Sequence, residues 1–384
     1  MKKRLSIFLY SLGSGGAERV ASVLLGELKE SFDITLILMN DTIFYEIPKE
    51  IDVVFLEKSR PFENGLLKFL KLPLLSWRYK KILKKYNINI SLSLMNRPNY
   101  INVMTKFFGY QGRVIISERG TPSKYYKDNL QGKISKSLIR FLYPKADKIV
   151  VNSMGNYMDL VENFSVKEKL LKLIYNLYDI QKIDFQKRDS CDILKNDNSF
   201  KFITVGRVDE GKNHRLLIKS LKDLDIDDVK LYIIGDGELK NELEQYVVSE
   251  NMENKVIFLG HRKNPYKYLY NSDCFVFSSN YEGFPNVLLE ALLCELPVIS
   301  TDCKSGPREI LAPDTPITKE TSSIELAEYG ILTKVGSIKD MQKAMKLIYK
   351  DKNLRDTYKN KAKIRANEFD KKKIIKKWIG VLDG

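Results

Sequence analysis

Two glutamates, Glu282 and Glu290, lie eight positions apart around a loop that leads from an apolar strand, predicted at residues 274–279, into a helix. Backbone N–H groups in the first turn of a helix have no partner within the helix and carry the positive end of its dipole, so they suit a diphosphate. A carboxylate accepts hydrogen bonds from the hydroxyl groups of a ribose or a hexose. The pattern therefore indicates a sugar-phosphate site; the alternative is a solvated loop glutamate and a glutamate on a helix surface.

A second loop with phosphate-binding chemistry follows the strand predicted at residues 201–205 and precedes a helix at residues 216–221. It contains two cations, Arg207 and Lys212. Ligands of open α/β sheets bind at the carboxyl ends of the strands, where this loop is expected to lie. Two fixed positive charges there can neutralise a diphosphate as it leaves a sugar.

A glycine-rich turn at residues 13–16 joins a strand predicted at residues 5–10 to a helix predicted at residues 17–28. A dinucleotide-binding fingerprint would need its third glycine at the position of Glu18, so the pattern excludes that class of oxidoreductase. Gly15 and Gly16 still let the backbone approach a ligand closely.

Strands alternate with amphipathic helices along the 384 residues, which predicts parallel α/β sheets in two domains of ordinary size. We expect a first domain at residues 1–180 and a second domain at residues 200–368. Residues 181–199 lack apolar periodicity and are interpreted as the linker.

Three motifs taken together, at residues 13–19, 206–212 and 282–290, resemble those of glycosyltransferase family 4, whose members are retaining enzymes of the GT-B fold. The resemblance extends over nearly the whole chain. Within the family the chain is most similar to bacterial transferases that add N-acetylgalactosamine to undecaprenyl-diphosphate-linked glycans for protein N-glycosylation. The segments that carry this closer likeness are residues 10–20, 94–100, 264–268 and 301–309.

The resemblance implies an α/β fold of two Rossmann-like, doubly wound parallel-sheet domains that face each other across a cleft. In this fold the last helix crosses back to the first domain, which we expect of residues 369–384. The first domain would receive the acceptor and the second would bind the nucleotide sugar.

The resemblance also implies roles for the loop residues. Arg207 and Lys212 match positions that hold the diphosphate, and Glu290 matches one that binds the ribose. Glu282 and the loop after it would meet the transferred sugar, so the expected catalytic residues are Arg207, Lys212 and Glu282. The expected donor-binding residues are Gly15, Gly16, Arg207, Lys212, Glu282, Gly283, Phe284, Asn286, Val287 and Glu290.

One position departs from the family pattern. Many members carry a histidine after the strand that is predicted here at residues 113–117, where it helps at the reacting sugar. This chain has Glu118 and Arg119 there, and its two histidines, His214 and His261, do not fit that role by their order in the chain. Glu118 and Arg119 are therefore the candidates for the acceptor side or the reaction centre.

Positive charge is concentrated in the first half of the chain. The net charge is +15, and residues 1–180 hold 29 Lys and Arg against 17 Asp and Glu, a difference of +12. No acidic residue occurs between Glu63 and Glu118, and within that gap residues 66–86 mix cations with leucines and aromatic residues. This make-up is typical of a segment that lies on an anionic membrane surface. The expected membrane-contact residues are Lys68, Lys71, Trp77, Arg78, Lys80, Lys81, Lys84 and Lys85.

Two other interpretations of this segment stay open. It could be an ordinary solvated helix whose leucines face the core, and Pro73 interrupts it. Binding to nucleic acid would follow equally from charge, but the chain has no RNA-binding signature and no zinc-finger spacing. We expect no nucleic-acid partner.

No metal or cofactor is expected. Asp223, Asp225 and Asp227 imitate the D-x-D signature of metal-dependent transferases, but they fall in a turn between a helix and the next strand, away from carboxyl ends. The four cysteines show no C-x-x-C spacing, which favours free thiols in the cytoplasm. No apolar run approaches the ~20 residues that a membrane-spanning helix needs, so we expect a peripheral protein on the inner face of the cell membrane.

The predicted function is the retaining transfer of a sugar, N-acetylgalactosamine from UDP-GalNAc, to an undecaprenyl-diphosphate-linked saccharide. One alternative is an O-antigen or capsule transferase that uses another UDP-hexose. A second alternative is a non-enzymatic basic protein that binds membrane or nucleic acid.

Overall fold

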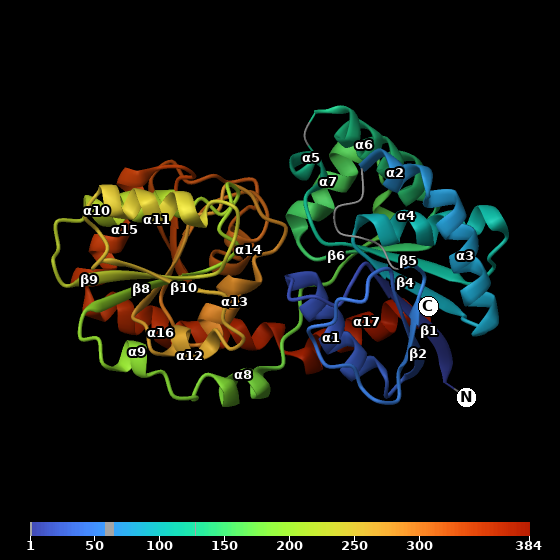
Figure 1. Ribbon diagram of the computed structural model, residues 1–384, viewed down its shortest axis with the longest axis horizontal. Coiled ribbons are helices and arrows are strands. Elements are labelled where there is room, and N and C mark those ends of the chain that lie inside the picture. The colour runs from blue at the N-terminus through green and yellow to red at the C-terminus, as the bar shows by residue number, and fades with distance from the viewer. Residues whose placement is uncertain (1, 58–64, 127) are drawn as a thin grey trace. The chain divides into compact units, whose positions relative to one another are not determined.

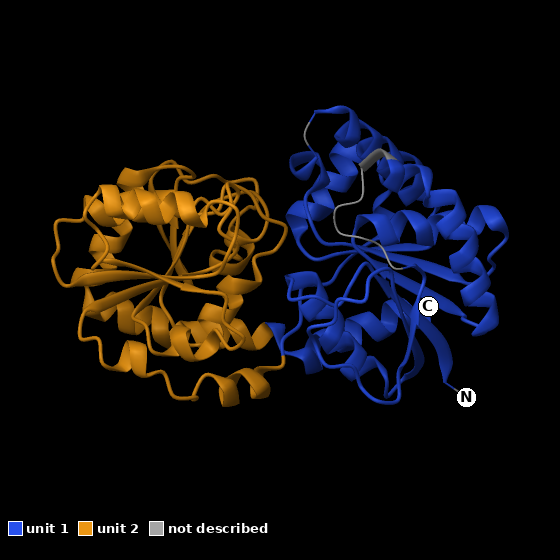
Figure 2. Cartoon of the chain, viewed as in Figure 1, with its two compact units in different colours: residues 1–178, 369–384 blue, residues 179–368 orange. Residues whose placement is uncertain are grey.

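A computed structural model describes residues 2–57, 65–126 and 128–384 (Figure 1). The chain divides into two compact units, which are described separately (Figure 2). Unit 1 comprises residues 1–178 and 369–384, and unit 2 comprises residues 179–368.

Unit 1 is built on a parallel sheet that has seven strands within the described residues, in the order β3-β2-β1-β4-β5-β6-β7. The strands are β1 (Lys3–Leu9), β2 (Phe32–Leu38), β3 (Asp52–Phe55), β4 (Ile90–Leu94), β5 (Arg113–Glu118), β6 (Lys148–Val151) and β7 (Leu171–Leu173). The helices are α1 (Gly16–Leu28), α2 (Gly65–Leu70), α3 (Leu72–Lys85), α4 (Asn96–Met104), α5 (Pro122–Tyr125), α6 (Leu130–Leu142), α7 (Met154–Phe164) and α17 (Lys371–Asp383), with 3-10 turns η1 (Thr105–Phe108), η2 (Tyr143–Lys145) and η3 (Glu168–Leu170).

Unit 2 repeats this plan, with the strand order β10-β9-β8-β11-β12-β14-β13 and one antiparallel edge strand, β13. The strands are β8 (Phe200–Val205), β9 (Val229–Ile234), β10 (Val256–Gly260), β11 (Cys274–Phe277), β12 (Val298–Thr301), β13 (Ile324–Ala327) and β14 (Gly330–Thr333). The helices are α8 (Ile180–Gln186), α9 (Asp192–Lys195), α10 (His214–Lys222), α11 (Lys240–Ser249), α12 (Tyr266–Tyr270), α13 (Asn286–Leu293), α14 (Pro307–Leu311), α15 (Ile338–Lys350) and α16 (Lys352–Ala366). The 3-10 turn η4 (Asn367–Phe369) ends the unit.

Both sheets are doubly wound, as predicted. In each sheet the strand order reverses at one point, between β1 and β4 in unit 1 and between β8 and β11 in unit 2. At such a point the connections run to opposite faces of the sheet, and a crevice forms outside the carboxyl ends of the strands, where open α/β sheets bind ligands. Because β8 and β11 are neighbours, the loops after them lie at this same edge, although some 70 residues separate them in the chain.

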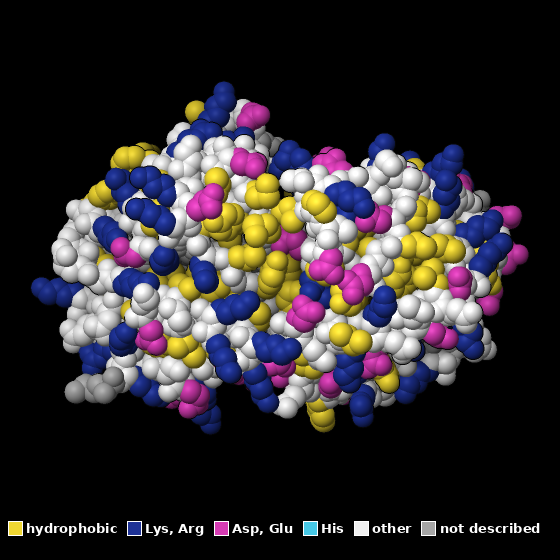
Figure 3. Space-filling model, turned by 180° about the vertical axis from the view of Figure 1, so that it is seen from behind, with side chains coloured by type: hydrophobic (Ala, Val, Ile, Leu, Met, Phe, Trp, Pro, Cys, Tyr) yellow, Lys and Arg dark blue, Asp and Glu magenta, His cyan; other side chains and the backbone are white. Residues whose placement is uncertain are grey.

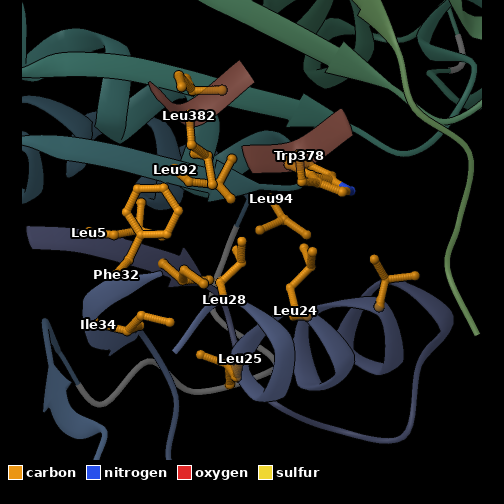
Figure 4. Close-up of a cluster of buried hydrophobic side chains, with 14 of the residues drawn as sticks. Leu5, Leu24, Leu25, Leu28, Phe32, Ile34, Leu92, Leu94, Trp378 and Leu382 are labelled. Carbon is orange, nitrogen blue, oxygen red and sulfur yellow. The ribbon is translucent and has the colours of Figure 1, made fainter. Parts of the chain in front are cut away.

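Apolar side chains at helical spacing hold α1 against the sheet of unit 1. The buried residues of α1 are Val20, Ala21, Leu24, Leu25 and Leu28. They pack on the strands together with α17, whose Trp378 is fully buried among leucines (Figure 4). Residues 369–384, expected to return to the first domain, thus contribute to the core of unit 1, and Arg113 Nη1 fixes the end of α17 by donating to the carbonyl of Leu382 at 3.0 Å.

The segment at residues 181–199, interpreted as a linker, instead folds within unit 2 and forms parts of α8 and all of α9. Ile183, Cys191 and Leu194 of the segment are buried, and the buried Lys187 Nζ bridges to Asp184 at 2.7 Å and to Glu295 at 2.9 Å. These contacts anchor the segment to the end of α13. Residues 181–199 are too short a segment to show apolar periodicity. Their helices are held by ion pairs and by burial against the rest of unit 2, which the local sequence pattern does not reveal.

Candidate active site

The two loops at the point of strand reversal in unit 2 are tied together by hydrogen bonds. Asn280 N donates to the carbonyl of Gly211 at 2.8 Å, and Ser278 Oγ donates to the carbonyl of Lys212 at 2.7 Å. The loop after β9 also closes on them, because a Cβ added to Gly235 (φ +149°) would lie 1.8 Å from the carbonyl oxygen of Gly206. The loops therefore form one structure at the carboxyl edge of the sheet.

Lys212 and Glu282, both predicted as catalytic, meet in this structure. Lys212 Nζ lies 2.5 Å from Glu282 Oε1, and their side chains are 25 % and 12 % exposed. The ammonium also lies 5.3 Å from the centre of the Phe277 ring. An ammonium has three N–H donors, so Lys212 can hold the carboxylate and still donate to an anion that arrives from solvent.

Arg207, the other predicted cation, is available to a ligand. Its side chain is 77 % exposed, and its Nε lies 3.6 Å from Asp209 Oδ2. Asp209 also accepts from Lys212 N at 3.0 Å through Oδ1, so one carboxylate sets the positions of both cations. Sequence reasoning missed Asp209; its place three residues before Lys212, where an aspartate commonly caps a turn, was the signal.

Glu290 lies in the second turn of α13 and is 1 % exposed. Buried carboxylates need partners, so the alternative of a surface glutamate is wrong. The start of α13 carries no side-chain cap, and its N–H groups face the end of the same loop that holds Glu282. Among the other predicted donor-site residues, Phe284 is buried, and Gly283, Asn286 and Val287 are half-buried around this turn.

A third loop, after β12, braces the start of α13. Gly306 adopts φ +101°, and a Cβ added there would lie 2.2 Å from Pro285 Cδ. The loop is held by buried Arg308, which pairs with Asp302 and, at 3.0 Å, with Glu325. This explains the motif at residues 301–309, whose structural role the sequence did not indicate.

Gly15 and Gly16 lie in unit 1, after β1, and both are exposed. Gly15 precedes α1, and a Cβ added to it would lie 2.3 Å from Glu18 Oε2, so the glutamate side chain folds back over the turn. These atoms belong to the end of a flexible side chain that can move aside, so packing alone does not require glycine at position 15.

Glu118 and Arg119 follow β5 in unit 1. Glu118 is 3 % exposed and accepts from Tyr143 OH at 2.5 Å. Burial raises the pKa of Glu118 to about 7, although the Tyr143 hydroxyl and two backbone N–H groups act in the opposite direction. Arg119 Nη2 donates to Asn176 Oδ1 at 2.5 Å, and burial lowers the pKa of Arg119 to about 10, so it stays cationic at neutral pH.

The two histidines belong to unit 2, whereas the family's histidine position belongs to unit 1. His214 begins α10 and is 2 % exposed, and burial lowers its pKa to about 4. It is therefore neutral at physiological pH. His261 is exposed after β10.

The acidic turn lies away from the site. Asp223, Asp225 and Asp227 are exposed between α10 and β9, at the amino edge of the sheet. Across residues 2–57, 65–126 and 128–384, no three His, Cys, Asp or Glu side chains are grouped as metal ligands. In the same residues, no helix has the length and apolar character that crossing a membrane requires.

The basic segment forms two helices, α2 and α3, rather than one. One face of α3 joins the core through Leu72, Leu75, Tyr79 and Leu83. The opposite face exposes apolar groups: Leu70 of α2 is 75 % exposed, Leu74 is 48 % exposed and Trp77 is 43 % exposed. Lys81 Nζ lies 3.5 Å above the Trp77 ring. The predicted contact residues that are exposed are Lys71, Trp77, Arg78, Lys81, Lys84 and Lys85, and those that are half-buried are Lys68 and Lys80.

Comparisons with known proteins agree with this geometry. The family model "Glycosyltransferase Family 4" matches residues 14–182, and the model "Glycosyl transferases group 1" matches residues 185–365. A protein of Campylobacter jejuni, N-acetylgalactosamine-N,N'-diacetylbacillosaminyl-diphospho-undecaprenol 4-alpha-N-acetylgalactosaminyltransferase, is 46 % identical over 100 % of both chains.

Two more distant likenesses extend the comparison. A second Campylobacter jejuni protein, an alpha-1,4-N-acetyl-D-galactosaminyltransferase that acts on a GalNAc-containing diNAcBac-PP-undecaprenol, is 27 % identical over 99 % of this chain and 98 % of its own. The crystal structure of Anabaena HepE with UDP has a TM-score of 0.78, at 18 % identity, over 100 % of both chains. The structural likeness confirms the predicted GT-B fold class.

The bracing of α13 by the loop after β12 can be tested by adding one methyl group. Gly306→Ala should destabilise the protein by ~1–3 kcal/mol, because the new Cβ combines a left-handed backbone with a clash against Pro285. Gly336→Ala is the matched control, since Gly336 has φ +75° but no atom within 4 Å of an added Cβ. Urea unfolding measures both; an equal loss of stability would contradict the bracing role.

Proposed function

Because the chain belongs to glycosyltransferase family 4, we propose that it transfers N-acetylgalactosamine from UDP-GalNAc to an undecaprenyl-diphosphate-linked saccharide, with retention of anomeric configuration. Membership of the family makes the chain a glycosyltransferase, so the alternative of a non-enzymatic basic protein is wrong. The identity of 46 % along the whole of the Campylobacter jejuni transferase is the observation that supports this donor and acceptor.

The site supports a mechanism based on leaving-group stabilisation. Arg207 and Lys212 would bind the diphosphate and neutralise the charge that develops as the sugar leaves. Backbone N–H groups in the first turn of α13 would add hydrogen bonds to the same phosphates. As the bond between the anomeric carbon and the diphosphate oxygen breaks, an acceptor hydroxyl would form the new glycosidic bond from the same face and pass its proton to the leaving diphosphate, which accounts for retention.

The two glutamates would serve hydroxyl groups rather than attack the sugar. Glu282 is held by Lys212 at 2.5 Å, which keeps its carboxylate as a fixed acceptor for a hydroxyl of the transferred sugar. Buried Glu290 would accept from the ribose. In this assignment Asp209 is a positioning residue, since it accepts from the backbone N–H of Lys212 and lies beside the Arg207 guanidinium.

A donor screen tests the function directly. The purified protein, UDP-hexoses, UDP-N-acetylhexosamines and a short undecaprenyl-diphosphate glycan should give product with UDP-GalNAc. Arg207→Ala and Lys212→Ala should each reduce kcat by ~10²–10³-fold, because each removes a charge aimed at the leaving group.

Lys222→Ala is the matched control for the screen. Lys222 also pairs with a glutamate, Glu250, but at the other end of α10, so its loss should leave turnover unchanged. Product with another UDP-sugar alone would overturn the donor assignment. Turnover within a few fold of wild type in both loop variants would remove Arg207 and Lys212 from the mechanism.

We also propose that transfer needs no metal ion, because the protein supplies the phosphate-neutralising charges itself. Activity should persist after treatment with EDTA, measured as the rate before and after exhaustive chelation. If EDTA abolished activity and magnesium or manganese restored it, a metal ion would help Arg207 and Lys212 to neutralise the charge of the diphosphate.

We propose that α2 and α3 hold unit 1 on the anionic inner leaflet, where a lipid-linked acceptor resides. The exposed Leu70, Leu74 and Trp77 would enter the interface, and the lysines beside them would meet lipid phosphates. Each cation contributes ~1 kcal/mol near an anionic leaflet. Lys and Arg side chains are numerous over the unit 1 half of the face drawn in Figure 3, which adds attraction at longer range.

Neutralising four lysines together, Lys80, Lys81, Lys84 and Lys85, should weaken co-sedimentation with anionic vesicles and slow transfer to the lipid acceptor. Affinity for the nucleotide sugar, measured by titration, should stay the same because none of the four lysines is among the expected donor-binding residues. Neutralising Lys372, Lys373, Lys376 and Lys377 is the matched control, since these are four exposed lysines of α17 in the same unit. Equal effects of the two sets would mean that α3 is an ordinary solvated helix face.

A further inference from the structure

Glu118 is the centre of a buried hydrogen-bond cluster in unit 1. Its Oε2 accepts from Tyr143 OH at 2.5 Å, and its Oε1 accepts from the backbone N–H groups of Arg119 at 2.9 Å and Gly120 at 3.2 Å. With its amide oriented so that its oxygen accepts from Tyr126 OH, Asn96 donates to Glu118 Oε2 at 2.9 Å. Four donors from three parts of the chain thus converge on one carboxylate.

The ionised form of the carboxylate is the form that can satisfy all four donors. A charged carboxylate accepts hydrogen bonds at both oxygens, whereas a protonated one must donate from one of them. A proton on Glu118 would face the N–H donors of Asn96 or of the Arg119–Gly120 turn, or it would force the Tyr143 hydroxyl to turn and accept, so one of the four hydrogen bonds to the carboxylate would be lost. The cluster is thus intact when Glu118 is charged.

The groups that Glu118 joins lie at the carboxyl edge of the sheet. Asn96 begins α4 directly after β4, next to Met95, which has φ +71°. The Arg119–Gly120 turn follows β5, which pairs with β4 in parallel. Asn96 lies within the motif at residues 94–100, to which no function has been assigned above. The carboxylate therefore fixes the spacing of two loops that leave neighbouring strands.

We propose that Glu118 is a positioning residue for the acceptor: its carboxylate locks Asn96 to the Arg119–Gly120 turn and thereby fixes the Arg119 guanidinium at the edge of the sheet. The inference rests on the proposed function, in which unit 1 receives the acceptor. It replaces the expectation that Glu118 itself contacts the reacting groups, because all of its acceptor positions at this edge are taken by protein donors.

The surroundings of Glu118 make its ionisation sensitive to pH near neutrality. Burial raises the pKa of Glu118 to about 7, and Asp159 of α7 acts in the same direction. The other ionisable groups that face it are Arg119, Tyr100 of α4, Tyr126 and Tyr143. Burial raises the pKa of each of these tyrosines, so they stay neutral donors, and transfer should decline as the pH falls through about 7.

Tyr143→Phe provides the test. The tyrosine hydroxyl lowers the pKa of Glu118, so its removal should shift the acid limb of the kcat/KM profile for the lipid acceptor to higher pH. KM for the nucleotide sugar should not change. Tyr79→Phe is the matched control: Tyr79 is a fully buried tyrosine of the same apolar core, and its hydroxyl contacts Ser6 and Ser91. The acid limb of the kcat/KM profile of Tyr79→Phe should coincide with that of the wild type.

Two further variants keep the test decisive if Tyr143→Phe does not fold. Asn96→Asp places a second carboxylate beside Glu118 and should shift the acid limb in the same direction. Glu118→Gln should abolish the limb and lower kcat/KM for the acceptor by ~10²-fold at every pH, the cost of misplacing a positioned group.

The outcomes separate this inference from the proposed function. No transfer by the wild type would overturn the proposed function. Transfer by the wild type with acid limbs that coincide in Tyr143→Phe, Asn96→Asp and Tyr79→Phe would overturn the positioning role of Glu118 alone. A large increase in KM for the nucleotide sugar in Glu118→Gln would overturn it as well, because Glu118 would then act on the donor.

Discussion

The parallel pairing of strands constrains everything else in this protein. Parallel strands need long crossover connections, most of which are helices in this protein, so both faces of each sheet are covered and the central strands are apolar. Polar functional side chains are then found in the loops at the ends of the strands. The strand order reverses between β8 and β11, so two loops of opposite direction meet at one edge and bring Lys212 to Glu282. The same reversal between β1 and β4 places the glycine turn beside the segment that begins α4.

Close backbone contacts make the unit 2 site rigid. Gly235 and Gly306 each occupy a position where a side chain would collide with a neighbouring loop, and the Arg308 ion pairs hold one of these loops from behind. The charged groups of the site are therefore fixed by loops that cannot move independently. Such pre-organisation is what leaving-group stabilisation requires, because charges that are already in place cost no reorganisation during the reaction.

Two carboxylates of the expected site residues, Glu282 and Glu118, are held in different ways. Glu282 of unit 2 is paired with a cation, Lys212, which orients it. In unit 1 Glu118 is surrounded by neutral donors, and burial is the main influence on its pKa. Without a cationic partner among the described residues to offset burial, the ionisation of Glu118 responds to modest changes in pH near neutrality.

The sequence by itself determined the class of fold, the strands and helices on either side of the three loops, and the loops that carry Arg207, Lys212 and Glu282, because apolar periodicity and turn residues are local signals. Tertiary structure decided which of these groups meet. The contact of Lys212 with Glu282, the burial of Glu290, the role of Asp209 and the cluster of Tyr143 with Glu118 depend on strand order and packing. Residues 181–199 show the same limit, since their order comes from the ion pairs of Lys187 with Asp184 and with the distant Glu295, and from the burial of a few apolar side chains. The local sequence shows which side chains are available, but which of them are in contact depends on the tertiary structure.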